Sequence, residues 1–169
     1  MDFQRSFAAL NIKLHDVKSF NCGKPAMNDF LSKHASKHTQ LGLSKTYVLC
    51  SVSQVGKCKV AAYFTLASAV VSREEIPSVS LPRYPIPVVL LARLAVDQDF
   101  QGLGLGAKSL VYALRQAYGL VSNGLPAHGL ILDVLDEDAL GFYQAFDTFE
   151  PFTLDPMRLF VSMKTIAEL

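Results

Sequence analysis

Apolar residues near the middle of the chain form two successive patterns, the first typical of a strand and the second of a helix. Residues 87–96 (PVVLLARLAV) are apolar and rich in β-branched side chains, which predicts a strand buried on both faces. From Leu105 to Ala117 apolar residues recur at helical spacing, with Lys108 and Arg115 on the other side. A short, polar and glycine-rich stretch separates the two patterns, so the predicted order is strand, glycine loop, helix.

The same patterns predict elements on both sides of this unit. Downstream, residues 129–135 read as a strand and residues from about 137 to 146 as a helix, with Asp136 as its N-cap. Upstream, residues 45–52 and 60–71 predict a hairpin around a turn at 54–59.

The two ends of the chain give weaker patterns. Apolar residues alternate with polar ones within residues 1–19, which suggests a first, half-exposed strand. Two short helices are predicted next: Pro25 suits the first turn of the first helix, and Gly42 suits the end of the second. The four prolines of residues 72–87 predict a loop over the sheet edge, and residues 149–163 predict one or two final strands.

This order of elements predicts a mixed α/β fold (α+β) with a central, mostly antiparallel sheet flanked by helices. With 169 residues, the chain is long enough for one domain with a substantial core, and we expect a single domain over residues 1–169. Charged residues interrupt every apolar run before it is long enough to span a bilayer, and no signal peptide opens the chain. We therefore expect a soluble, cytoplasmic protein with no membrane partner.

Charge is distributed unevenly, although the net charge is only +1. Residues 1–93 hold 12 Lys and Arg against 5 Asp and Glu, a balance of +7, whereas residues 94–169 hold 4 against 10, a balance of −6. A basic half attracts polyanions through its long-range field. Two solvated faces without a partner are the alternative that charge alone leaves open.

The glycine loop permits three phosphate-binding interpretations, which residue spacing separates. A P-loop requires Lys directly after the last Gly, but Ala107 stands between Gly106 and Lys108. A dinucleotide fingerprint requires an acidic residue about 20 positions on, and none lies between Leu103 and Leu132. The third interpretation takes Gln101, Gly104 and Gly106 as Q-x-x-G-x-G, which resembles the acetyl-CoA pyrophosphate loop of the GNAT N-acetyltransferases. An ordinary glycine-rich turn is the alternative for the loop alone.

A second motif follows in the expected place. Asp136, Ala139 and Tyr143 lie on one face of the later predicted helix and resemble the acid, alanine and tyrosine pattern that follows the fifth strand in GNAT enzymes. Tyr143 has a role in that family as the acid that protonates the departing thiolate. A core aromatic on an amphipathic helix is the alternative for Tyr143.

Comparison of longer sequence segments narrows the resemblance from GNAT enzymes in general to one group within them. FNCGKPAMNDFL, YPIPVVLLARLAVDQDFQGLGLG and LDEDALGFYQAF are similar to the GNAT-fold toxins of bacterial type II toxin–antitoxin modules, over nearly the whole chain. Those toxins acetylate the α-amino group of aminoacyl-tRNA and so block translation. The resemblance implies acetyl-CoA as cosubstrate, no metal, a homodimer, a cognate antitoxin of ribbon-helix-helix type, and operator DNA bound only through that antitoxin.

Two positions depart from the family pattern. Leu103 stands where the family usually has a basic or polar residue, which removes a possible phosphate contact. The usual aromatic-Gly-Phe after the tyrosine helix appears here as Phe146-Asp147-Thr148-Phe149, one residue longer and without glycine.

The resemblance also implies a set of site residues. Backbone N–H groups near the end of the central strand would polarise the thioester carbonyl, and the glycine loop and the start of the tyrosine helix would hold the cosubstrate. These cosubstrate residues are Leu94, Ala95, Val96, Gln101, Gly102, Leu103, Gly104, Leu105, Gly106, Ala107, Asp136 and Ala139. No convincing general base is evident, and none is obligatory because an α-amine with a pKa near 7.7–8.0 is partly neutral at cytosolic pH.

Basic residues are the candidates for the acceptor substrate. Arg93 interrupts an apolar strand, and burying its charge there is costly unless the guanidinium is paired or faces a ligand. We therefore expect Arg93 to orient the substrate or to pair with Asp133 or Asp136. For tRNA phosphates the candidates are Lys24, Lys33, Lys37, Lys45 and Arg83. Arg73 and Tyr84, in the same proline-containing loop as Arg83, could also contact substrate.

Other reactive residues have simpler explanations. Cys22, Cys50 and Cys58 lack metal-ligand spacing and are read as reduced thiols, with a nucleophilic Cys22 as the alternative. His34 and His38 share a helix face, but no third ligand is evident, so a basic surface patch is favoured over a zinc site.

Three functions remain open from the sequence. The leading one is an acetyl-CoA-dependent N-acetyltransferase toxin acting on aminoacyl-tRNA. The second is an N-acetyltransferase for a protein N-terminus or a small-molecule amine, which needs no polyanion surface. The third is a catalytically silent domain that binds an antitoxin and operator DNA as a repressor component.

Overall fold

The computed structural model describes residues 3–52, 55–77 and 80–169. The chain divides into two compact units, the first made of residues 1–67 with 93–113 and the second of residues 68–92 with 114–169. The long elements β4, β5 and α3 each begin in one unit and end in the other. Each unit is described by itself below.

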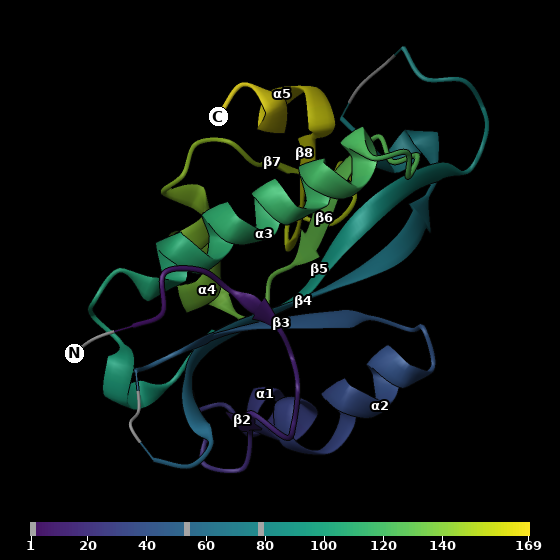
Figure 1. Ribbon diagram of the computed structural model, residues 1–169. Coiled ribbons are helices and arrows are strands. Elements are labelled where there is room, and N and C mark those ends of the chain that lie inside the picture. Colours follow the sequence, from purple (N-terminus) through teal and green to yellow (C-terminus); the bar gives the residue numbers. More distant parts are fainter. Residues whose placement is uncertain (1–2, 53–54, 78–79) are drawn as a thin grey trace. The chain divides into compact units, whose positions relative to one another are not determined.

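The described residues form a mixed sheet in which antiparallel pairs predominate, as the order of elements predicted (Figure 1). The hydrogen-bonded strand order is β1-β3-β4-β5-β6-β8-β7, and β2 pairs with β4. Parallel pairing is found for β5 with β6 and for β2 with β4. The strands are β1 (Ala8–Ala9), β2 (His15–Asp16), β3 (Lys45–Cys50), β4 (Cys58–Val71), β5 (Ile86–Val96), β6 (Gly129–Asp133), β7 (Glu150–Pro151) and β8 (Arg158–Ser162).

Helical segments alternate with these strands. The α-helices are α1 (Pro25–Asp29), α2 (Ala35–Gln40), α3 (Leu105–Ser122), α4 (Glu137–Gln144) and α5 (Met163–Ala167). The shorter segments are a π-helical turn, η1 (Phe30–His34), and two 3₁₀ turns, η2 (Arg73–Glu75) and η3 (Gln98–Phe100). Pro25 occupies the first turn of α1, and Gly42, with a φ of +74°, follows α2, as the sequence predicted.

In the first unit, a helical layer packs on the β3–β4 hairpin. The hairpin register pairs Lys45 with Leu66 and Val48 with Tyr63. Buried side chains of η1 and α2, including Phe30 and Leu31, join Val48 and Tyr63 in one apolar cluster. The segment α1–η1–α2 is therefore held along the hairpin, where Figure 1 shows α2 next to β3.

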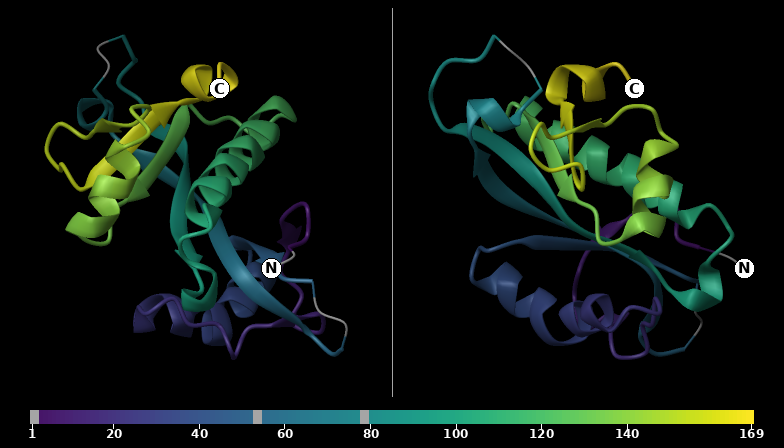
Figure 2. Two further views of the ribbon diagram at one scale, coloured as in Figure 1. Left: turned by 90° about the vertical axis from the view of Figure 1, so that its left-hand side faces the viewer. Right: turned by 180° about the vertical axis from the view of Figure 1, so that it is seen from behind.

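In the second unit, β6 lies between two partners. Val88 of β5 pairs with Gly129 in parallel, and Gly129 pairs with Ser162 of β8 in antiparallel. Figure 2 shows these strands from two further sides. A Cβ at Gly129 would clash with the ring of Phe160, so glycine is required for this close approach. Ile131 and Phe160 belong to the apolar cluster of this unit.

The predicted first strand is not formed by the described residues 3–19. These residues contain only the two short strands β1 and β2, and Ile12 and Leu14 are exposed. Asn11 interrupts the alternation because its side-chain Oδ1 accepts a hydrogen bond from the Lys13 N–H and its backbone O accepts from Leu14 N–H. An Asx turn of this kind competes with a strand for the same backbone groups.

Other differences are confined to element ends. Pro87 and Ala92 of β5 are exposed, so the apolar strand is not buried on both faces throughout; small apolar residues are tolerated at a surface. The C-terminal segment adds the unpredicted helix α5, which Ser162 caps by accepting from Thr165 N–H. Gln54 in the predicted turn, and residues 78–79 in the predicted loop, lie outside the described residues.

None of the described helices is both long and apolar enough to cross a membrane.

Candidate functional site

The glycine loop follows β5 and the short turn η3, and it ends at the first turn of α3. Gly102 and Gly104 have φ values of +81° and +79°, a conformation that side chains other than glycine rarely adopt. No atom lies within 4 Å of the place where a Cβ would stand at either glycine, so backbone conformation, not space, requires glycine there. This loop leads into α3, an 18-residue helix, and the free N–H groups of its first turn favour the binding of an anion. Leu103, which is 53% exposed, offers no charge to such an anion.

Gln101, the first residue of the motif, has its side chain bound to the protein. Its Nε2 donates to the backbone O of Val96 at 3.0 Å and to that of Cys22 at 3.4 Å. The glutamine therefore joins the end of β5 to a segment almost eighty residues earlier in the chain. Sequence reasoning placed Gln101 in the motif but could not reveal these partners.

Three motif residues of the second unit are brought together by α4. Asp136 caps this helix, since its Oδ1 accepts from the Ala139 N–H at 2.8 Å, as predicted. Tyr143 lies one turn further along and is 8% exposed. Burial raises the pKa of Tyr143 to about 12, because the phenolate would lose its solvation. The phenol therefore keeps its proton at physiological pH.

Aromatic rings surround Tyr143 within its own unit. The ring centres of Phe142 and Phe149 lie 5.0 and 6.0 Å from that of Tyr143, both in edge-to-face geometry. The chain reaches Phe149 through Asp147, a non-glycine residue with a φ of +50°. Asp147 therefore adopts the left-handed conformation in the segment where the family pattern has glycine.

Arg93 is held by a ring and not by a carboxylate. Its guanidinium carbon lies 4.2 Å from the ring centre of Phe30, and Nη1 lies 4.0 Å from Sδ of Met27. Among the described residues, no carboxylate is within ion-pair distance of Arg93. Asp133, one of its two predicted partners, is bound by Arg158 through two hydrogen bonds of 2.6 and 2.9 Å.

A groove lined by lysines lies beside the segment α1–η1–α2 in the first unit. The cavity measures about 530 Å³ and carries four lysines against one carboxylate, that of Asp16. Its lining residues, called the lysine groove below, are Ile12, Asp16, Val17, Lys18, Ser32, Lys33, Ser36, Lys37, Gln40 and Lys57. The predicted Lys33 and Lys37 therefore line the same groove as Lys18 and Lys57, which sequence reasoning missed. The only signal for these two lysines in the sequence was the net positive charge of residues 1–93.

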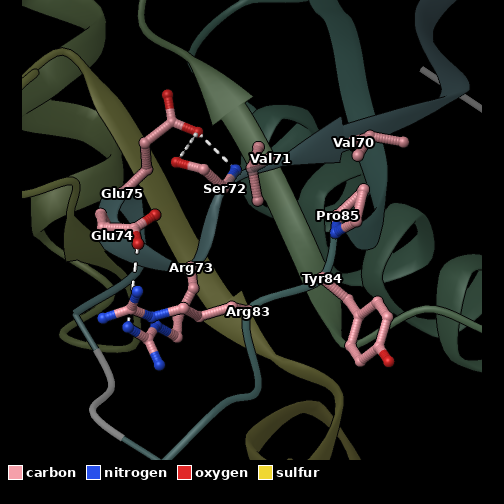
Figure 3. Close-up of a pocket in the computed structure, with 9 residues that line it drawn as sticks. All are labelled: Val70, Val71, Ser72, Arg73, Glu74, Glu75, Arg83, Tyr84 and Pro85. Carbon is pink, nitrogen blue, oxygen red and sulfur yellow. Dashed lines mark hydrogen bonds and ion pairs between the residues drawn. The ribbon is translucent and has the colours of Figure 1, made fainter.

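The other predicted basic residues are not among those that line the lysine groove. Lys45 approaches the ring of Tyr47 at 5.9 Å, and Lys24 precedes α1. Arg83 lines a cavity of about 420 Å³ in the second unit together with Arg73 and Tyr84. Figure 3 shows Arg73 and Arg83 among the residues that line this cavity, with Glu74 paired to Arg73.

The cysteines and histidines have structural surroundings. All three cysteines are free thiols; Cys50 is buried, which raises its pKa to about 12. The rings of His34 and His38 are 6.2 Å apart, and His38 also packs against Phe30. No group of three or more His, Cys, Asp or Glu side chains within the described ranges could hold a metal ion.

Comparison with known proteins gave relatives but no match to a family model. The chain is 36% identical to the tRNA-acetylating toxin of Mycobacterium tuberculosis over 155 residues, which cover 88% of this chain and 87% of the relative. It is 24% identical to the probable toxin TacT of Sinorhizobium fredii over 177 residues, covering 98% and 95% of the two chains.

Solved structures are similar over almost the entire length. A crystal structure of a tyrosine-to-phenylalanine mutant of KacT has a TM-score of 0.88 at 26% identity and covers 99% of both chains. AtaT complexed with acetyl-methionyl-tRNAfMet has a TM-score of 0.86 at 29% identity, covering 99% of this chain and 98% of AtaT. AtaTR bound with acetyl-CoA has a TM-score of 0.83 at 30% identity, covering 99% and 97%.

Proposed function

Since the chain belongs to the family of tRNA-acetylating toxins with the GNAT fold, we propose that it transfers the acetyl group of acetyl-CoA to the α-amino group of aminoacyl-tRNA. The observation that carries this proposal is the 36% identity to a tRNA-acetylating toxin together with the glycine loop at the start of α3. In the reaction the neutral amine attacks the thioester carbonyl, the carbon–sulfur bond breaks, and an amide and coenzyme A result. The amine loses a proton and the leaving thiolate gains one, so charge and protons balance.

Acetyl-CoA is bound by the loop between β5 and α3. Gly102, Gly104 and Gly106 leave the backbone bare, and the N–H groups of the first turn of α3 meet the diphosphate. The remaining cosubstrate residues are Leu94, Ala95, Val96, Gln101, Leu103, Leu105, Ala107, Asp136 and Ala139. Backbone N–H groups at Leu94–Val96 stabilise the oxyanion that forms when the amine attacks.

Tyr143 supplies the proton for the leaving sulfur. Its phenol is protonated throughout the physiological range because burial raises its pKa to about 12. The thiol that forms has a reference pKa near 8.5, below that of the buried phenol, so full transfer of the phenolic proton to the free thiolate is uphill. Tyr143 therefore donates a hydrogen bond to sulfur as the carbon–sulfur bond breaks, and the proton that the amine releases balances the one that the thiolate takes up. The similar structures of KacT and AtaT mutants carry tyrosine-to-phenylalanine replacements, which remove a phenolic donor of this kind.

The tRNA is bound through its phosphates by the lysine groove. Lys18, Lys37 and Lys57 pair with no carboxylate among the described residues, and Lys33 pairs only with the exposed Asp29 at 3.3 Å. Such lysines give affinity that is independent of sequence and sensitive to salt. Arg93, Lys24, Lys45 and Arg83 are further candidate contacts.

The relatives support a proposal for the biological setting. Similar structures include AtaT with its antitoxin AtaR, and the KacTA and AtaT–AtaR complexes with DNA. We propose a cytoplasmic homodimer that a cognate antitoxin of ribbon-helix-helix type neutralises, with operator DNA bound only through that antitoxin. We also propose that residues 1–169 act as a single catalytic domain.

Transfer of radiolabelled acetyl from acetyl-CoA to a pool of charged total tRNA tests the proposed function, with deacylated tRNA as the control. Label that enters only charged tRNA, and that is lost with the amino acid on ester hydrolysis, supports it. If charged tRNA takes no label while peptides or small amines do, the acceptor assignment is wrong. If no acceptor takes label although acetyl-CoA binds, the domain is catalytically silent.

A further inference from the structure

A buried carboxylate joins the acetyl-CoA loop to the segment that precedes α1. Asp97 follows β5 directly and is 2% exposed. Its Oδ2 accepts from the Asn21 N–H at 2.9 Å and lies 3.5 Å from Nζ of Lys59, while Oδ1 accepts from the Asp99 N–H at 2.9 Å. A charge this deeply buried is tolerated because it is both paired and hydrogen-bonded. The carboxylate thus fixes the backbone of Asn21.

Asn21 in turn closes the turn that leads into α1. Its backbone O accepts from the Gln98 N–H at 2.8 Å, and its Oδ1 accepts from Gly23 N–H at 2.9 Å and from Nδ2 of Asn28 at 3.0 Å. Asn28 completes the ring, because its Oδ1 accepts from the Cys22 N–H at 2.8 Å. Gly23 has a φ of +90°, and a Cβ there would lie 2.8 Å from Nε2 of Gln98.

Gln101 makes a second, separate link between the same two segments. Its Nε2 bonds to Cys22 O and to Val96 O, as described above. The first residue of the acetyl-CoA motif therefore holds the turn at residues 21–28 and the end of β5 at once. The side chains of Asp97 and Gln101 and the backbone N–H of Gln98 attach that turn, and Asn28 determines the shape of the turn between these attachments.

The turn continues into the segment that carries tRNA-binding lysines. Asn28 belongs to α1, which runs through η1 with Lys33 into α2 with Lys37. We propose that Asn28 and Gln101 are positioning residues that hold residues 25–40 in register with the acetyl-CoA loop at residues 101–107. This inference rests on the proposed function, since only an acceptor bound to residues 25–40 needs such alignment. A displacement of reacting atoms by about 1 Å lowers the rate on the order of a hundredfold.

Asn28→Ala tests the inference, with Asn123→Ala as the matched control. Asn123 is exposed after α3, and its side chain has no hydrogen bond within the described part of the chain. In Asn28→Ala we expect kcat/KM for charged tRNA to fall about 10- to 100-fold while the Kd for acetyl-CoA stays unchanged. In the control Asn123→Ala we expect an unchanged Tm. An unaltered kcat/KM in Asn28→Ala would overturn the inference, and so would an equal loss of acetyl-CoA affinity.

The double variant distinguishes alignment from two unrelated defects. Gln101→Ala removes the second link, so Asn28→Ala combined with Gln101→Ala should lose little more than the more severe single variant. Losses that multiply would show that the two residues act independently, contrary to the proposal.

A measurement without tRNA separates this inference from the proposed function. Hydrogen–deuterium exchange of peptides from residues 21–34 is followed with and without acetyl-CoA. Acetyl-CoA should slow exchange there in the natural protein and in Asn123→Ala, but not in Asn28→Ala. If the natural protein failed to acetylate charged tRNA, the proposed function would be wrong. The exchange pattern would still show whether the acetyl-CoA loop is coupled to residues 25–40 through Asn28. The same protection in all three proteins would overturn this coupling.

Discussion

The guanidinium carbon of Arg93 lies 4.2 Å from the ring centre of Phe30, close enough for a cation–π interaction. Phe30 is buried in the apolar cluster of the first unit, and Sδ of Met27 is the other group near Arg93. No described carboxylate competes for this guanidinium, so its charge is available to an anionic group of the substrate.

Arg93→Met should separate packing from charge, because methionine keeps the contact with the ring and removes the cation. We expect the free energy of unfolding to change by no more than about 1 kcal/mol. The KM for charged tRNA should rise about 10- to 100-fold, the equivalent of one lost charge-assisted hydrogen bond. Arg115→Met, an exposed change on α3, is the control. An unchanged KM would assign Arg93 a structural role.

Tyr143→Phe removes the proposed acid while keeping the aromatic packing around Phe142 and Phe149. We expect kcat to fall about 10²- to 10⁴-fold, the usual span for a lost acid catalyst. Calorimetric titration should show an unchanged Kd for acetyl-CoA. A rate close to that of the natural protein would exclude Tyr143 from the chemistry.

The pH profile should rise once and then stay level. The rate increases as the α-amine loses its proton, with a reference pKa near 7.7–8.0. The protonated phenol is neutral, so burial favours it and raises its pKa to about 12; the acid is therefore retained until far above the amine transition. Short single-turnover reactions between pH 6 and 10 measure kcat/KM before the aminoacyl ester hydrolyses. A fall between pH 9 and 10 that Tyr143→Phe abolishes would contradict the raised pKa.

The lysine groove predicts a salt-dependent defect. Lys18→Glu combined with Lys37→Glu should weaken tRNA binding more at low than at high salt, and should reduce the slope of log K against log salt by about 2. The paired control is Lys108→Glu with Lys164→Glu, which lie outside the groove. Filter binding of tRNA at several salt concentrations checks this result. Equal slopes for the natural protein and the groove variant would place the tRNA elsewhere.

The left-handed backbone conformation of Asp147 predicts that a glycine there would stabilise the protein. At a φ of +50° an aspartate is strained relative to glycine, which adopts this conformation without steric cost. Asp147→Gly should raise the free energy of unfolding by about 0.5–1 kcal/mol, measured by urea denaturation. Asp138→Gly, in the first turn of α4, should instead lower it by about 0.5–1 kcal/mol, because glycine is the poorer helix former and a carboxylate near the helix N-terminus is lost. If Asp147→Gly destabilised the protein, the aspartate side chain would have a role that its conformation does not explain.

Sequence reasoning succeeded where the information is local. Hydrophobic periodicity and turn chemistry depend on neighbours in the chain, so β5, α3 and α4 appeared close to their predicted bounds, and Asp136 proved to be the cap of α4. The prediction failed for residues 1–19 because the side chain of Asn11 captures backbone groups that an alternating pattern assigns to a strand.

The sequence by itself determined the order of the central elements from β3 to α4, the glycine loop and the family, because each of these depends on short contiguous motifs. Only the tertiary structure decided which distant residues meet. Arg93 took Phe30 and not an acid as its neighbour, Gln101 bonded to Cys22, and Lys18 and Lys57 joined Lys33 and Lys37 in one groove. These contacts depend on how strands and helices pack, and packing brings together residues that no local pattern relates.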